Sequence, residues 1–144
     1  MMSAIVDQPP PIPQASRRPV WEIVIEHVTR RRDEGTYGVA ASSVDLVIAD
    51  MRARDEIGRD CYGTPLTSGN GRDHLVDAMQ ELLDACVYLA NELDEHGIGP
   101  GELINIARVP DGKKRWRLIC VQQHLAEQIR AVISLRMLIE ERAS

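Results

Sequence analysis

The 144-residue sequence contains no phenylalanine, and only two tryptophans and three tyrosines supply aromatic rings. A core must therefore be built from aliphatic side chains, and the Leu- and Ala-rich composition favours helices. No run of 18 apolar residues occurs, so we predict that the chain does not span a membrane. The N-terminus lacks a basic start followed by an apolar run, and we expect no signal peptide.

Cysteine is also scarce, and the three cysteines have no spacing typical of a disulfide framework or a zinc site. We expect reduced thiols and a cytoplasmic location. The four histidines form no His-x-x-x-His pair, which disfavours zinc further. A net charge of −5 disfavours stable nucleic-acid binding.

The most informative stretch runs from Asn70 to His96, and no proline or glycine interrupts residues 72–96. We predict a helix here. Asn70 is the expected cap of its first turn, with Asp73 at the position of a capping-box acid. His96-Gly97 is a typical stop signal.

Acidic side chains gather on one face of this predicted helix. At about 100° per residue, five side chains fall within roughly 80° of one another, and the apolar residues occupy the other side. The five are Asp73, Asp77, Glu81, Asp84 and Tyr88. A solvated surface is one explanation of this carboxylate face, and a metal site is the other.

Two observations favour the metal site. Solvated helix faces usually mix both signs of charge, yet no Lys or Arg occurs between Arg72 and Arg108. Asp77 and Glu81 are like charges one turn apart, which destabilises a helix unless a cation binds them. Mg²⁺ prefers carboxylates together with phosphate oxygens, and Glu81-x-x-Asp84 sets two carboxylates within reach of one ion.

The rest of the chain predicts an all-α bundle of four or five helices in a single domain over residues 19–144. Pro-rich residues 1–18 are expected to form a flexible arm. Amphipathic patterns predict further helices from about Pro19 to Glu34, from Ser42-Ser43 to about Ile57-Gly58, and from about Val121 to Arg142.

Residues 103–121 fit two local structures. They could form a β-hairpin around Pro110-Asp111-Gly112, or a short helix, a turn and the start of the last helix. We favour the helices, because an isolated hairpin is only marginally stable. A basic cluster beside Trp116 is either a solvated helix start or a phosphate contact, and it comprises Lys113, Lys114, Arg115 and Arg117.

A loop rich in glycine and small hydroxyl residues precedes the acidic helix and carries candidate phosphate contacts. Backbone N–H groups at a helix N-terminus, together with arginine, hold phosphate well. The loop is not a P-loop, because Gly-x-x-x-x-Gly-Lys-Ser/Thr is absent. The residues it would deliver are Arg59, Tyr62, Thr64, Asn70 and Arg72.

The combined pattern Tyr-Gly-Thr-Pro-Leu, Asn-Gly-Arg-Asp and Asp-Ala-x-Gln-Glu-x-Leu-Asp-x-x-Val-Tyr-Leu resembles small phage-type MazG-like proteins. These belong to the all-α nucleoside triphosphate pyrophosphohydrolases. The resemblance covers a core of about residues 44–96. It implies a Mg²⁺ or Mn²⁺ site built from acids on two neighbouring helices, and a homodimer or homotetramer.

Glu81 and Asp84 match the Glu-x-x-Asp motif that the resemblance assigns to the metal and to catalysis, and Asp77 lies one turn earlier. The family's Glu-x-x-Glu on the preceding helix has no match here. Three acids are the expected substitutes: Asp50, Asp55 and Glu56. The expected substrate-binding residues are Arg59, Tyr62, Asn70, Arg72, Asp73 and Lys113.

Two functions remain open from the sequence. An enzyme would cleave a nucleoside triphosphate between its α and β phosphates, giving pyrophosphate and a ribo- or deoxyribonucleoside monophosphate. A non-enzyme would be a helical interaction module, such as a phage accessory protein. The wide apolar arc of the acidic helix predicts self-association in either case.

Overall fold

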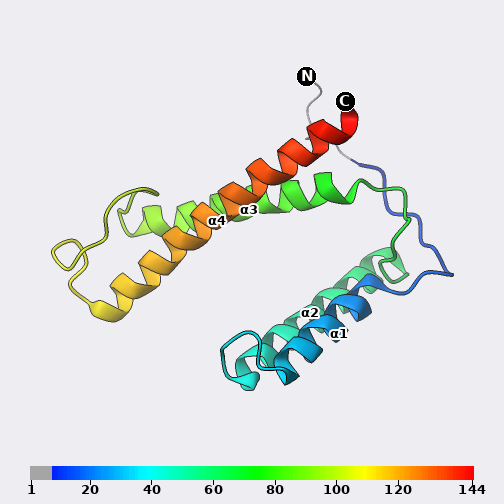
Figure 1. The fold of residues 1–144 in the computed structure, drawn as a ribbon, viewed down its shortest axis with the longest axis horizontal. Helices are drawn as coiled ribbons and strands as arrows, with labels where there is room; N and C mark the ends of the chain where they lie inside the picture. Colours follow the sequence, from blue (N-terminus) through cyan, green and yellow to red (C-terminus); the bar gives the residue numbers. More distant parts are fainter. Residues whose placement is uncertain (1–7) are drawn as a thin grey trace. The chain divides into compact units, whose positions relative to one another are not determined.

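The computed structural model describes residues 8–144, in which four α-helices form (Figure 1). They are α1 (Val20–Asp33), α2 (Ala41–Tyr62), α3 (His74–Glu95) and α4 (Gly112–Ala143). No strand forms in residues 8–144, where an isolated bridge joins Pro19 to Thr67. The predicted all-α class is confirmed. None of the four helices combines the length and apolar composition needed to cross a membrane.

The described chain divides into two compact units, residues 8–72 and residues 73–144. In the first unit α1 and α2 form a helical hairpin (Figure 1). Its small core contains Val28, Val44 and Ile48, with partly buried aliphatic side chains around them. The hairpin thus uses one face of α2 and leaves the opposite face outside its core.

The bounds of α2 correct the sequence prediction at both ends. The helix begins at Ala41 after Ala40, which makes no side-chain cap, so the expected serine cap was wrong. It also continues through Gly58 to Tyr62. An internal glycine weakens a helix by only about 1 kcal/mol, so it need not end one. The helix ends where Gly63 adopts a φ of 71°, a left-handed conformation that glycine adopts without strain.

Residues 8–19 lie along the loop that follows α2. The backbone N–H of Ile12 donates to the Asn70 carbonyl oxygen at 2.9 Å. The N–H of Gln14 donates to the Thr67 hydroxyl oxygen at 3.0 Å. These contacts connect the proline-rich segment to the loop, while the predicted flexibility of residues 1–18 stays a prediction. Residues 1–7 of that arm lie outside the described residues.

In the second unit α3 and α4 run antiparallel and pack along their lengths (Figure 1). One cluster centres on Leu93 and Leu118, whose side chains are completely buried. Another gathers Val76, Met79 and Ile139 near the other end of the helix pair. The two clusters together fix which side of α3 faces α4.

Residues 103–121 form the start of the last helix, as the favoured prediction had it, but neither the short preceding helix nor the β-hairpin forms. The helix starts at Gly112, and the segment before it is irregular. This connection buries Ile98, Ile104 and Val109 against the Leu93–Leu118 cluster. These side chains gain more from covering the helix ends than a short isolated hairpin or helix would gain from its own hydrogen bonds. The last helix begins at Gly112, which extends the amphipathic stretch predicted from about Val121. Its cap is Asp111, whose carboxylate accepts the Lys114 N–H at 2.8 Å.

Replacing Leu118 with alanine should destabilise this unit by about 2–5 kcal/mol, because a completely buried leucine leaves a cavity. Urea unfolding followed by circular dichroism measures the change. Leu103→Ala is the matched control, since Leu103 is 78% exposed and should change stability by less than about 0.5 kcal/mol. Equal losses in the two variants would contradict the α3–α4 core.

Candidate metal and nucleotide site

The start of α3 is fixed by Asp73 rather than by Asn70. The Asp73 carboxylate accepts the backbone N–H groups of Leu75 and Val76 at 3.2 and 3.3 Å, and the helix begins at His74. It also pairs with the Arg142 guanidinium near the end of α4. The predicted Asn70 cap was wrong, because two positive-φ glycines, Gly69 and Gly71, keep the chain around it out of a helix.

Packing against α4 turns the acidic face of α3 away from the core. Val76, Met79 and Leu93 are buried on the α4 side. At 100° per residue, Glu81 and Asp84 lie on the opposite side of the helix. Both side chains are exposed, and neither forms a hydrogen bond or ion pair with any residue in 8–144. Asp77, one turn earlier, is half-buried.

The structure does not gather the predicted metal ligands into a three-residue cluster. Among residues 8–144, no group of three or more His, Cys, Asp or Glu side chains is placed to hold a metal ion. The α3 acids are in one unit, and the α2 candidates Asp50, Asp55 and Glu56 are in the other. By itself, α3 supplies two outward carboxylates, those of Glu81 and Asp84. Mg²⁺ commonly binds one or two protein carboxylates when phosphate oxygens and water molecules complete its coordination shell.

The α2 acids differ in their surroundings. Asp55 is half-buried and accepts the Nε–H of Arg59 through both carboxylate oxygens at 3.1 Å. Asp50 and Glu56 are exposed, and neither has an ion-pair partner within residues 8–144. Asp55 and Arg59, predicted as metal ligand and phosphate contact, therefore neutralise each other in this structure.

The remaining predicted substrate residues of the first unit lie at the end of α2 and in the loop after it. Tyr62 is 64% exposed. The Arg72 guanidinium donates to the Pro9 carbonyl oxygen at 2.7 Å, so the proline-rich segment engages a predicted phosphate contact. Arg72 and Arg59 thus both have partners inside their own unit.

Asn70 is the most unusual of these residues. Its side chain is 1% exposed, and its Oδ1 accepts the Arg72 N–H at 3.1 Å. Its Nδ2 has no hydrogen-bond partner within residues 8–144. A buried donor without a partner costs about 1–3 kcal/mol, so this amide retains an unused capacity to bind an acceptor.

Lys113 lies in the first turn of α4, at the opposite end of the second unit from Asp77. Leu118, one to two turns after Lys113 on α4, packs against Leu93 at the end of α3. Glu81 lies 12 residues before Leu93, or about 18 Å along the helix. Lys113 is exposed and has no ion-pair partner in the described chain. Cations are unfavourable at a helix N-terminus, so this turn is a region of positive potential. Within this unit, Lys113 therefore lies far from Glu81 and Asp84.

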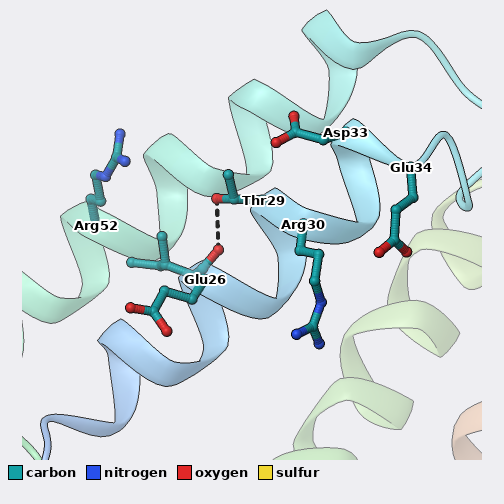
Figure 2. Close-up of a pocket in the computed structure, with 7 residues that line it drawn as sticks. Glu26, Thr29, Arg30, Asp33, Glu34 and Arg52 are labelled. Carbon is teal, nitrogen blue, oxygen red and sulfur yellow. Dashed lines mark hydrogen bonds between the residues drawn. The ribbon is translucent and has the colours of Figure 1, made fainter.

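A shallow groove on the α1–α2 hairpin was not anticipated from the sequence (Figure 2). Figure 2 shows acidic and basic side chains around it, and the Thr29 hydroxyl donates to the Ile25 carbonyl oxygen at 2.7 Å. Its lining residues are Ile25, Glu26, Thr29, Arg30, Asp33, Glu34 and Arg52. Three acids and two arginines give it no single sign of charge. Polar residues at helical spacing are typical of any solvent-exposed helix face, so the sequence does not distinguish this groove from ordinary surface.

No protein-family model matches this chain, and neither a curated protein nor a solved structure matches it. The resemblance to MazG-like proteins therefore rests on the motif residues alone.

The Asp73–Arg142 contact predicts a pH-dependent contribution to stability. The hydrogen bond from Arg142 lowers the pKa of the Asp73 carboxyl, and the N–H groups of Val76 and Leu75 act in the same direction against partial burial. A lowered pKa stabilises the fold above the unfolded-state value of about 3.9 and loses that effect as pH falls through the folded-state value.

Asp73→Asn keeps an N-cap but removes the charge, so the stability advantage of the wild type should shrink between about pH 6 and pH 2. Urea midpoints across this range measure the difference. Asp94→Asn, an exposed change on the same helix, controls for general charge effects. A wild-type advantage over Asp73→Asn that is independent of pH would contradict the assignment.

Proposed function

We propose that the protein is a Mg²⁺-dependent nucleoside triphosphate pyrophosphohydrolase. The observation that carries the proposal is the outward carboxylate face of α3. Glu81 and Asp84 are exposed, lack ion-pair partners within residues 8–144, and match the Glu-x-x-Asp motif of the MazG-like proteins that the sequence resembles. A surface that served only solubility would usually intersperse basic residues among these acids.

The donor chemistry of this face suits Mg²⁺, with Mn²⁺ as an alternative. Carboxylate oxygens are hard ligands, and one or two of them suffice when the nucleotide contributes phosphate oxygens. A metal ion held there would neutralise phosphate charge and promote deprotonation of a bound water. Glu81 and Asp84 would hold the ion, while Asp77 would assist from the preceding turn.

The other predicted contacts have unequal support. Asn70, Arg59 and Arg72 belong to the unit of residues 8–72, whereas Glu81 and Asp84 belong to the unit of residues 73–144. Arg59 is paired with Asp55, and Arg72 donates to the Pro9 carbonyl oxygen. The metal site proposed on α3 does not require these three residues. Asp73 already has a complete structural role at the α3 terminus, and the proposal does not require it.

The second candidate function is a helical interaction module. Its support is the number of large apolar side chains left exposed on the helices, since extended apolar patches usually mark binding surfaces. On α4, Ile129, Ile133 and Met137 follow one another at a spacing of four residues and are 44–64% exposed. A non-catalytic protein would need these surfaces but would not need a carboxylate face without basic partners.

Turnover separates the two functions. The protein should release pyrophosphate, and not orthophosphate, from at least one ribo- or deoxyribonucleoside triphosphate in the presence of Mg²⁺. Asp84→Asn should lower kcat/KM by about 100-fold or more, because an amide cannot supply the charge that holds the metal. A coupled pyrophosphate assay with each nucleotide in turn measures both quantities.

The matched control is Asp94→Asn, the same change on the same helix but outside the carboxylate face. It should retain wild-type activity, and both variants should keep the helical circular dichroism of the wild type. Activity that survives Asp84→Asn would make the acids a solvated surface. Absence of pyrophosphate with every nucleotide would leave the interaction module as the better account.

A further inference from the structure

The tip of the second unit, residues 103–117, exposes three large apolar side chains. Figure 1 shows the loop after α3 and the first turns of α4 at the same end of the helix pair. Leu103 is 78% exposed, Ile106 is 69% exposed, and Trp116 is 67% exposed. Ile104, between the first two, is buried in the Leu93–Leu118 cluster. The unit therefore uses one isoleucine of this loop for its core and leaves its larger apolar neighbours in water.

Hydrogen bonds hold the loop against the first three turns of α4. The Arg115 guanidinium donates to the Val109 carbonyl oxygen at 2.9 Å. Farther along the helix, the Gln122 side-chain amide donates to the Glu102 carbonyl oxygen at 2.6 Å. These two contacts lie on either side of the exposed leucine and isoleucine in the sequence. An anchored loop therefore presents both side chains to solvent.

The tip is also strongly basic. Five basic residues and one acid, Asp111, give it a net charge of +4 in a chain whose total is −5. The five are Arg108, Lys113, Lys114, Arg115 and Arg117. Lys113, Lys114 and Arg117 are exposed, and none of them has an ion-pair partner within residues 8–144. The positive end of the α4 dipole adds to the potential there.

The exposed tryptophan lies among these cations. At 100° per residue, Lys113, Trp116 and Arg117 fall within about 100° of one another, on the side of α4 away from the buried Leu118. An indole ring has a large apolar body and one polar N–H group, so it is most stable where an apolar phase meets water. Flanking cations favour an apolar phase whose surface is negative.

We propose that the tip binds the surface of a membrane that contains anionic lipids. The three exposed apolar side chains enter the boundary between headgroups and acyl chains, and the three unpaired cations contact lipid phosphates. Binding of this kind places the protein on the bilayer and requires no helix that crosses it. It accounts for the exposed apolar residues and the local positive charge together.

The aliphatic side chains favour a membrane over a nucleic acid as the partner. A tryptophan among cations also suits single-stranded nucleic acid, where a base stacks on the ring and the cations contact phosphates. Leu103 and Ile106 have no comparable use in such a complex, whereas a lipid interface stabilises both. The negative charge on the rest of the chain further disfavours a long polyanion.

The inference does not depend on the proposed function. Lys113 lies far from Glu81 and Asp84 within the second unit, so the lipid contact and the proposed metal site use separate surfaces. Lys113 was expected to bind substrate, and the proposal gives it a lipid phosphate instead.

Co-sedimentation of the full chain with lipid vesicles tests the proposal. The wild type should bind vesicles of about one-third phosphatidylglycerol and two-thirds phosphatidylcholine at least about tenfold more tightly than vesicles of phosphatidylcholine alone. Added salt should weaken this binding, because it screens the attraction. Ile106→Ser should lower the partition constant at least about fivefold by removing an apolar side chain from the interface. Arg117→Gln should lower it about fivefold by removing one charge.

Each variant has a matched control on α4 outside the tip. Ile133→Ser repeats the isoleucine change at a position that is 55% exposed. Arg130→Gln repeats the arginine change at an exposed position without an ion pair in the described chain. Both controls should bind vesicles as the wild type does. All four variants should keep the helix content of the wild type by circular dichroism.

Tryptophan fluorescence locates the contact. Trp21→Phe leaves Trp116 as the only tryptophan of the chain. Its emission should shift to shorter wavelength when the anionic vesicles are added, because the ring leaves water. Phosphatidylcholine vesicles should give no shift.

Four results would overturn the proposal. The first is no binding to the anionic vesicles. The second is binding that Ile106→Ser and Arg117→Gln leave unchanged, and the third is Trp116 emission that does not move. The fourth is binding of a single-stranded oligonucleotide, measured by fluorescence anisotropy, without binding of vesicles, which would assign the tip to nucleic acid. None of these readouts involves pyrophosphate release, so their outcome is separate from that of the proposed enzyme activity.

Discussion

The rest of the second unit depends on the packing of Leu93 against Leu118. Both side chains are completely buried, and the irregular segment between α3 and α4 adds Ile104 and Val109 to the same cluster. A helix packed along its length cannot rotate about its axis without exposing those side chains. The α3–α4 core therefore determines that Glu81 and Asp84 face outward, as the proposed metal site requires.

The same principle explains the hairpin of the first unit. Its core uses Val28, Val44 and Ile48, so the side of α2 that carries Asp50 and Arg54 is left open. Short helical hairpins bury little apolar surface, and Leu46, Val47 and Ile57 of α2 are left exposed. The two units thus present different surfaces: outward carboxylates on α3, and a mixture of exposed apolar and charged side chains on α2.

The helix class and the acidic face of α3 follow from local patterns, and both could be predicted from sequence. The ends of the helices could not be predicted, because several nearby residues are equally suitable as caps. Asp73 rather than Asn70 caps α3. The α2 helix passes through Gly58 and ends at Gly63. The segment before α4 was misjudged because its isoleucines and valine serve a tertiary core rather than a local periodicity. The partners of Arg59 and Arg72, and the burial of the Asn70 amide, depend on tertiary contacts that no spacing reveals.

The central claim is that the outward face of α3 binds a divalent cation together with a nucleotide. Backbone amide NMR signals recorded with substoichiometric Mn²⁺ and a non-hydrolysable nucleoside triphosphate test it directly, because a bound paramagnetic ion broadens nearby signals. The account predicts that broadening centres on residues 77–88 and is abolished in the double variant Glu81→Gln, Asp84→Asn. Broadening centred elsewhere, or unchanged in that variant, would contradict it.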